Sequence, residues 1–225
     1  MNRFINSVLL FIAILTLGFV VIVGKDLPID FLRTTGQYLP YKGVAFIAIA
    51  GVFILIGGRR SVQRWMGTAL IRKTDRYQWN VPIGKERQSR TIFYLVLEGC
   101  FHLAIAGVFL SITTDSLPVA IALIFLAFDH FLYAWLGHSK KIFRIGITKT
   151  ALVLVDRDVR ILYFSGLRKI SVQQHILFFE YIKELELDIS SDAVPEDKRA
   201  EFREALKQQI DLDRVYLDES FKNFN

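Results

Sequence analysis

Two apolar stretches decide the fold of this chain: IFYLVLEGCFHLAIAGVFLSIT at residues 92–113 and LPVAIALIFLAFDHFLYAWLG at residues 117–137. Each matches the roughly 20 residues that an α-helix needs to cross a hydrocarbon core about 30 Å thick. Each also contains one carboxylate and one histidine, namely Glu98 with His102 and Asp129 with His130. An ionisable side chain costs roughly 2.5–3.5 kcal/mol at the centre of a membrane helix, so these residues need partners or a purpose.

The rest of the chain separates apolar from charged residues. It has 225 residues, of which 52% are hydrophobic and 22% are charged, so the two classes must lie in different segments. We expect a bundle of four transmembrane helices over about residues 5–24, 41–58, 92–113 and 117–136. We interpret the first stretch as a span and not as a signal peptide, because its apolar run exceeds the roughly 7–15 residues of a signal core.

The connection between the second and third spans, residues 59–91, is strongly basic. It has nine Lys and Arg residues and only two acidic ones, Asp75 and Glu86. The positive-inside rule places such a connection in the cytoplasm, and an even number of spans then places both termini there. We therefore expect a multi-pass membrane protein with both termini in the cytoplasm. Basic and acidic residues are equal in number after residue 137, so we do not expect nucleic acid as a partner.

An amphipathic helical stripe follows the second span in SVQRWMGTALIRK, residues 61–73. Its apolar members are Val62, Trp65, Met66, Ala69 and Leu70. Two interpretations stay open: a helix at the inner headgroup boundary, or an extension of the second span that packs this stripe on the C-terminal domain. In the first, the residues that contact the membrane surface and its anionic lipids would be Arg59, Arg60, Arg64, Trp65, Arg72 and Lys73.

Short β-like runs replace the long apolar stretches after residue 140. They lie at about 141–147, 150–156, 159–164, 169–179 and 183–189. After Pro195, an apolar residue recurs every four positions at Phe202, Leu206 and Ile210, which predicts one amphipathic helix. We therefore predict two domains: a four-helix transmembrane domain over residues 1–137, and a cytoplasmic α+β domain over residues 138–225, with an antiparallel sheet capped by one helix.

The C-terminal runs carry a resemblance to a known family. The pattern I-T-x-x-A-L begins at Ile147, a later strand has Tyr163, Leu167 and Ile170, and F-x-x-x-L begins at Phe202. In these features residues 141–210 or so, about 70 of the 225, resemble a bacterial pleckstrin-homology-like (PH-like) domain. The resemblance implies a partial barrel capped by one helix, and a scaffold for binding or assembly in a protein of the bacterial inner membrane. It transfers no catalytic residue to this chain.

The four ionisable residues of the third and fourth spans are predicted to share one layer of the bilayer. With the inner boundary near Thr91 and a rise of about 1.5 Å per residue, Glu98 and His130 lie about 10 Å deep, Asp129 about 12 Å and His102 about 16 Å. Glu98 and His102 share a helix face because they are four residues apart. Asp129 and His130 point about 100° apart, so at most one of them faces the third span.

Several roles for this cluster stay open. We favour a structural one, in which carboxyl–imidazole hydrogen bonds satisfy the buried groups and hold the bundle together. A proton or ion relay would use the same residues. A zinc, iron or manganese site would take Glu98, His102 and His130 as ligands. Haem held by His102 and His130 is disfavoured by the different depths of the two histidines.

The chain lacks the sequence motifs of common enzymes. It has no glycine-rich phosphate loop, CxxC, HExxH or G-x-S-x-G, and we expect no catalytic residue and no cofactor. The pattern favours an accessory or assembly protein whose cytoplasmic domain binds a protein partner, a second copy of the chain or the membrane surface. The alternative is a small transporter, a proton- or ion-conducting protein or a metal-dependent membrane enzyme that uses the intramembrane cluster.

Overall fold

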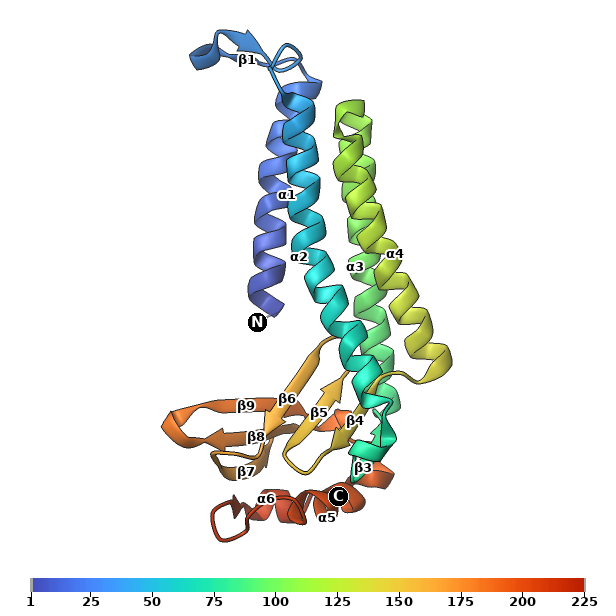
Figure 1. Cartoon of the computed structure of the whole chain (residues 1–225), viewed down its shortest axis with the longest axis vertical. Coiled ribbons are helices and arrows are strands. Elements are labelled where there is room, and N and C mark those ends of the chain that lie inside the picture. Colours follow the sequence, from blue (N-terminus) through green and yellow to red (C-terminus); the bar gives the residue numbers. More distant parts are fainter. Residues whose placement is uncertain (1, 225) are drawn as a thin grey trace. The chain divides into compact units, whose positions relative to one another are not determined.

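Four long helices dominate the first 140 residues of the computed structural model, which describes residues 2–224 (Figure 1). They are α1 Asn2–Gly24, α2 Lys42–Ile71, α3 Lys85–Ile112 and α4 Leu117–Lys140. All four are long and apolar enough to cross a membrane, and they lie at the four predicted spans. The helix α2 is unbroken to Ile71, so residues 61–71 extend the second span, which is one of the two open interpretations.

The chain divides into two compact units. The first consists of Met1–Val62 and Tyr94–Ala134, and the second of Gln63–Phe93 and Trp135–Asn225. This differs from the predicted division at residue 137, with its loop over residues 59–91. The difference arises because α2 and α3 both continue beyond the apolar stretches, and their polar ends belong to the second unit.

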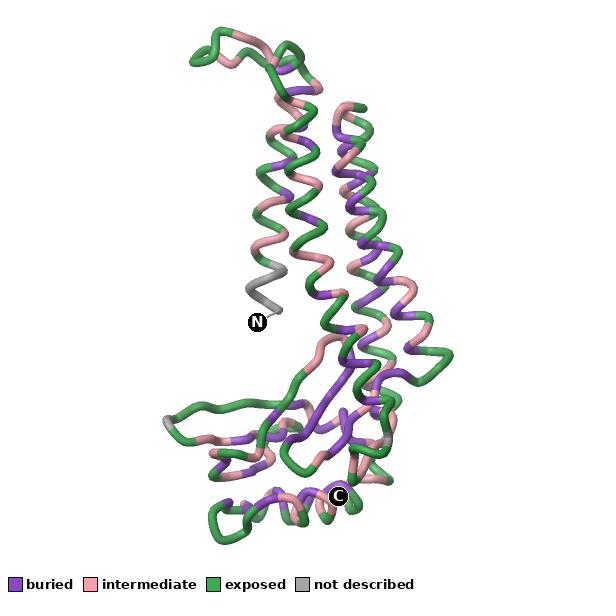
Figure 2. The backbone as a smooth tube through the Cα atoms, in the orientation of Figure 1, coloured by how far each residue is buried: buried purple, intermediate pink, exposed green. Residues whose placement is uncertain are grey.

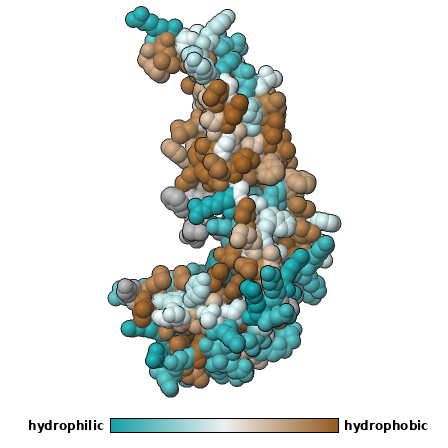
Figure 3. Space-filling model, viewed as in Figure 1, coloured by the Kyte–Doolittle hydropathy of each residue, from teal (hydrophilic) through white to brown (hydrophobic). Residues whose placement is uncertain are grey.

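Aromatic and aliphatic side chains pack between the helices of the first unit. Phe46, Phe53, Phe109 and Leu123 are at most 2% exposed, and the rings of Phe19 and Phe46 lie 4.8 Å apart. The outward faces are also apolar, as the brown surface of the helices in Figure 3 shows. A short hairpin of β1 Pro28–Ile29 and β2 Thr34–Thr35 joins α1 to α2. Large apolar side chains on the outside are what a surrounding hydrocarbon layer permits.

Two four-stranded sheets form the second unit. One is antiparallel, in the order β3 Trp79–Pro82, β4 Arg144–Ile147, β5 Ala151–Val155 and β6 Val159–Tyr163. The other has the order β10 Tyr216–Leu217, β7 Leu167–Gln173, β8 Ile176–Tyr181 and β9 Glu186–Ser190, with β10 parallel to β7. The strand β5 is buried along its whole length (Figure 2).

The C-terminal helix occupies the position in sequence that its periodicity predicts. The helix α5, Arg199–Lys207, buries Phe202 and Leu206 completely, and the short helix α6, Glu219–Lys222, buries Phe221. The ring of Phe202 lies 5.4 Å from that of Trp79 in β3 and 6.5 Å from that of Phe221. One aromatic residue of α5 therefore joins the first and last segments of this unit.

Two strand predictions differ from the structure. The run 169–179 is not one strand but the end of β7 and the start of β8, joined by a turn in which Gln174 and His175 have φ of 47° and 64°. Turns with positive φ favour Asn and Gly, so Gln174 and His175 do not indicate a turn in the sequence. The strand β3 lies in the predicted loop and ends with Pro82, which an edge strand tolerates because its outer N–H groups need no partner within the sheet.

The apolar stripe at the end of α2 does not pack on the sheet, although the second of the two open interpretations expected it to. Val62, Met66 and Leu70 are 56, 60 and 44% exposed. The opposite face makes the contact instead: Ile71 is fully buried against Val153 and Val155 of β5. That interpretation of the stripe is therefore wrong.

Gly67, on the buried face of α2, lets this helix lie close to Val159 of β6. A Cβ atom at Gly67 would lie 2.2 Å from Cγ2 of Val159. We expect Gly67→Ala to lower the free energy of unfolding by about 1–2 kcal/mol, because the cost of overpacking exceeds the gain in helix propensity. Gly58→Ala is the control, since no atom lies within 4 Å of its added Cβ. Thermal unfolding of the full chain in detergent would measure both, and equal stability of the two variants would contradict this packing.

Candidate functional site

Three helices of the first unit meet at the carboxylate of Glu98. Its Oε2 atom lies 3.2 Å from Nη1 of Arg60 on α2 and 3.2 Å from Nε2 of His130 on α4. The side chains of Arg60 and His130 are each 7% exposed, and that of Glu98 is 19% exposed. A carboxylate that contacts a cation and an imidazole from two other helices restrains all three helices. We call Arg60, Glu98, His102 and His130 the polar cluster.

Asp129 contacts a different helix from its neighbour His130. Oγ of Ser61 on α2 donates a hydrogen bond of 2.7 Å to Oδ1 of Asp129, which is 8% exposed. His130 contacts Glu98 of α3, whereas this hydrogen bond of Asp129 goes to α2. The α2–α4 contact through Ser61 is a further interaction of the kind that satisfies polar groups in helical bundles.

The two histidines of the polar cluster have defined hydrogen-bond roles. Nδ1 of His102 lies 2.7 Å from the carbonyl oxygen of Glu98, and Nδ1 of His130 lies 2.6 Å from that of Leu126. A carbonyl oxygen only accepts, so each Nδ1 donates and carries a proton. In the neutral ring, Nε2 is therefore the acceptor. Nε2 of His130 faces Oε2 of Glu98 across their 3.2 Å contact.

The predicted side-chain pairing of Glu98 with His102 takes another form. His102 binds the backbone carbonyl of Glu98 and not its carboxylate, and its ring lies 5.3 Å from that of His130, tilted by 31°. The four-residue spacing brings the two residues together as expected, but the carboxylate contacts α2 and α4 instead. The polar cluster is thus centred on Glu98, with His102 beside it.

Two of the residues assigned to the membrane surface are buried. Arg60 is 6% and Arg64 is 1% exposed, which contradicts a role at the lipid headgroups for these two. Arg59, Arg72 and Lys73 are exposed and Trp65 is half-buried, so nothing in their burial opposes that role.

The polar cluster does not have the geometry of a metal centre. Across the part of the chain that the structure describes, no group of three or more His, Cys, Asp or Glu side chains is placed to hold a metal ion. The predicted ligand set of Glu98, His102 and His130 comes together in space, but Oε2 of Glu98 already contacts the guanidinium of Arg60, which is itself a cation. The residues fit an ion-pair and hydrogen-bond network better than a ligand shell.

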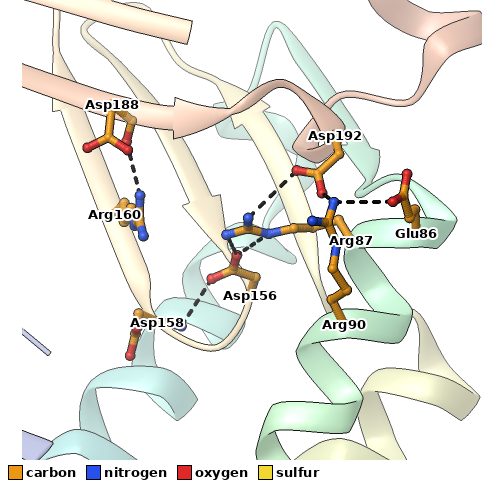
Figure 4. Close-up of polar contacts among 8 residues, drawn as sticks. All are labelled: Glu86, Arg87, Arg90, Asp156, Asp158, Arg160, Asp188 and Asp192. Carbon is orange, nitrogen blue, oxygen red and sulfur yellow. Dashed lines mark hydrogen bonds and ion pairs between the residues drawn. The ribbon is translucent and has the colours of Figure 1, made fainter. Parts of the chain in front are cut away.

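A second polar network lies in the second unit and stabilises it (Figure 4). Nε and Nη2 of Arg87 on α3 lie 2.9 and 2.5 Å from Oδ2 of Asp156, which follows β5 and is 2% exposed. Nη1 of Arg87 lies 3.6 Å from Oδ1 of Asp192, and Arg90 contacts Asp192 as well. This network joins the start of α3 to two turns of the sheets. Its charged side chains form ion pairs with one another, so we assign the network a structural role.

Comparison of the chain with known protein families, with curated proteins and with solved structures finds no match.

Proposed function

We propose that this chain is an integral protein of the bacterial inner membrane that serves as an accessory or assembly subunit and not as an enzyme. Four helices of sufficient length and apolarity support the membrane assignment. The basic stretch 59–91 supports an orientation with both termini and the second unit in the cytoplasm. The polar cluster then lies within the bilayer, where paired groups of this kind hold helices together.

The second unit is proposed to be a PH-like domain. Its order of elements supports this: four antiparallel strands (β3–β6), three more (β7–β9) and then the amphipathic helix α5. The strand β3 comes from the basic stretch 59–91. It therefore lies outside residues 141–210, which carry the sequence resemblance. A domain of this class implies a scaffold for binding, so its exposed surface is where a partner would dock.

The edge strand β9 is the observation that carries the partner proposal. It is the last strand of its sheet. Leu187 lies on β9 and is 36% exposed, and Leu185 just before it is 53% exposed. Glu186 and Asp188 alternate with them and are also exposed. Arg160 of β6 donates to the backbone oxygen of Asp188 at 3.0 Å (Figure 4), which protects one point of this edge. An exposed edge with apolar side chains is a template for strand addition.

The occupant proposed for this edge is an extended segment of another membrane-complex subunit, in which basic and apolar residues alternate. The backbone of β9 would pair with it, the two leucines would contact its apolar residues, and the two carboxylates would attract its basic ones. A second copy of this chain fits less well, because β9 would then meet its own acidic residues and like charges directly opposite one another are destabilising.

Site-specific photo-crosslinking in native membranes tests this proposal. A benzoylphenylalanine at position 187 is expected to give one discrete adduct, whose crosslinked peptide has alternating basic and apolar residues. The same probe at Leu212, which is 57% exposed but lies outside the strands, is the control and should give none. Reversing the charges with Glu186→Lys and Asp188→Lys should abolish the adduct. Adducts only with a second copy, or adducts insensitive to this charge reversal, would contradict the proposal.

A further inference from the structure

A cavity of about 420 Å³ lies among all four helices of the first unit. Its volume is within the roughly 300–1,000 Å³ of known small-molecule sites. Most of its wall is apolar, with Ala13 from α1, Phe53 from α2 and Leu123 from α4 among the contributors. All four members of the polar cluster also line it. An apolar volume with a few convergent polar groups is typical of a binding site.

The cavity opens sideways, toward the surroundings of the helices. Leu10 of α1 and Leu97 and Phe101 of α3 line it and are 49, 53 and 52% exposed. If the helices span the bilayer, as proposed above, these half-exposed side chains border hydrocarbon. A ligand would then enter from the membrane and would have an apolar portion that lies between α1 and α3. This step depends on the proposed membrane location.

The polar cluster selects the headgroup of such a ligand. The guanidinium of Arg60 lies 3.2 Å from the carboxylate of Glu98, so its charge is already balanced within the cluster. A second anion would compete with that carboxylate and would bring uncompensated charge into an apolar site, which is costly. The cluster therefore favours a neutral headgroup.

His102 defines the hydrogen bond that the headgroup makes. Its Nδ1 atom is committed as a donor to the carbonyl of Glu98, so Nε2 of the neutral ring is an acceptor. The ring lines the cavity beside that of His130. A hydroxyl group of a ligand would donate a hydrogen bond to this acceptor at the polar end of the apolar cavity.

We propose that this cavity binds a neutral membrane amphiphile whose headgroup hydroxyl donates a hydrogen bond to Nε2 of His102 and whose hydrocarbon tail leaves between Leu10 and Phe101. Phenols, quinols and long-chain alcohols belong to this chemical class. The inference adds a ligand site to the proposed accessory function and requires only the membrane location, not the partner at β9.

Two matched probes test the proposal on the full-length protein in lipid nanodiscs. They are 4-decylphenol, which has a hydroxyl donor, and its methyl ether, which has the same ring and tail but no donor. We expect the phenol to bind about tenfold more tightly than the ether, the difference that one buried hydrogen bond makes. Titration followed by native mass spectrometry would give both affinities and the number of sites.

Three variants distinguish the contribution of the hydrogen bond to binding from that of the cavity volume, and both from effects on folding. His102→Phe keeps a ring and removes the acceptor, so the phenol should fall to the affinity of the ether. His138→Phe alters an exposed histidine that does not line the cavity and should leave both affinities unchanged. Ala13→Phe fills the apolar part and should weaken both probes. Each variant is first checked for an unchanged unfolding temperature, and Ala13→Leu replaces Ala13→Phe if the larger residue prevents folding.

Two results would overturn the proposal. Equal affinity of phenol and ether, unchanged by His102→Phe, would mean that the cavity holds an ordinary acyl chain. If either probe still binds the Ala13→Phe variant with unchanged affinity, its binding site lies elsewhere on the protein. Neither result depends on whether β9 docks a partner, so failure here and failure of the crosslinking experiment are distinguishable.

Discussion

Glu98→Ala is expected to lower the free energy of unfolding of the full chain by about 3–5 kcal/mol, the cost of removing one member of a buried ion pair. The substitution leaves the guanidinium of Arg60, whose side chain is 7% exposed, without this carboxylate. It also removes the carboxylate that contacts Nε2 of His130. Three helices lose their common contact at once. Denaturation by SDS in mixed micelles would measure the change.

A matched substitution separates the buried cluster from charge loss in general. Lys42 and Asp115 form an ion pair of 2.6 Å in the same unit, but their side chains are 28 and 38% exposed. Asp115→Ala is therefore expected to cost at most about 1 kcal/mol. In addition, the double variant Arg60→Met with Glu98→Met should recover much of the loss, because no unpaired charge stays buried. Equal costs for Glu98→Ala and Asp115→Ala would contradict the central position of Glu98.

Arg87→Ala should destabilise the second unit by about 3 kcal/mol. The reason is that Asp156 is 2% exposed and accepts two hydrogen bonds from Arg87, so it would stay buried without this cation. Hydrogen–deuterium exchange of the full chain should show faster exchange in β5 and at its turn. Arg90→Ala is the control: its side chain is 52% exposed, so the expected cost is below about 1 kcal/mol. Similar exchange in both variants would show that Arg87 does not have this role.

The four long apolar helices could be predicted because their signal is local. A run of about 20 apolar residues identifies a span without knowledge of its neighbours. The difference in direction between Asp129 and His130 also follows from the sequence, because helix geometry sets it. Arg60 could not be assigned to the cluster in this way. Its position after an apolar span and among basic residues suggested lipid headgroups, and only packing shows that its face of α2 is turned inward.

The sheets of the second unit depended more on long-range contacts. The strand β3 has four residues, ends in Pro82 and pairs with β4, which follows it by about 60 positions. No local pattern reveals such a pairing. The turn at Gln174 and His175 also depends on a contact between strands. Both residues have positive φ although neither is a glycine, and the pairing of β7 with β8 holds them in this conformation. Their own conformational preferences do not indicate a turn.

The depth of the polar cluster can be measured with the natural cysteine of the chain. Cys100 is exposed on α3 between Glu98 and His102, so a nitroxide attached there reports on the surroundings of the cluster without further mutation. In a bilayer, we expect frequent collisions with molecular oxygen and few with a water-soluble nickel complex. Ser139→Cys in a Cys100→Ala background, near the end of α4, should show the reverse. If the nickel complex reaches Cys100 as readily as position 139, the cluster does not lie within the hydrocarbon layer and the account fails.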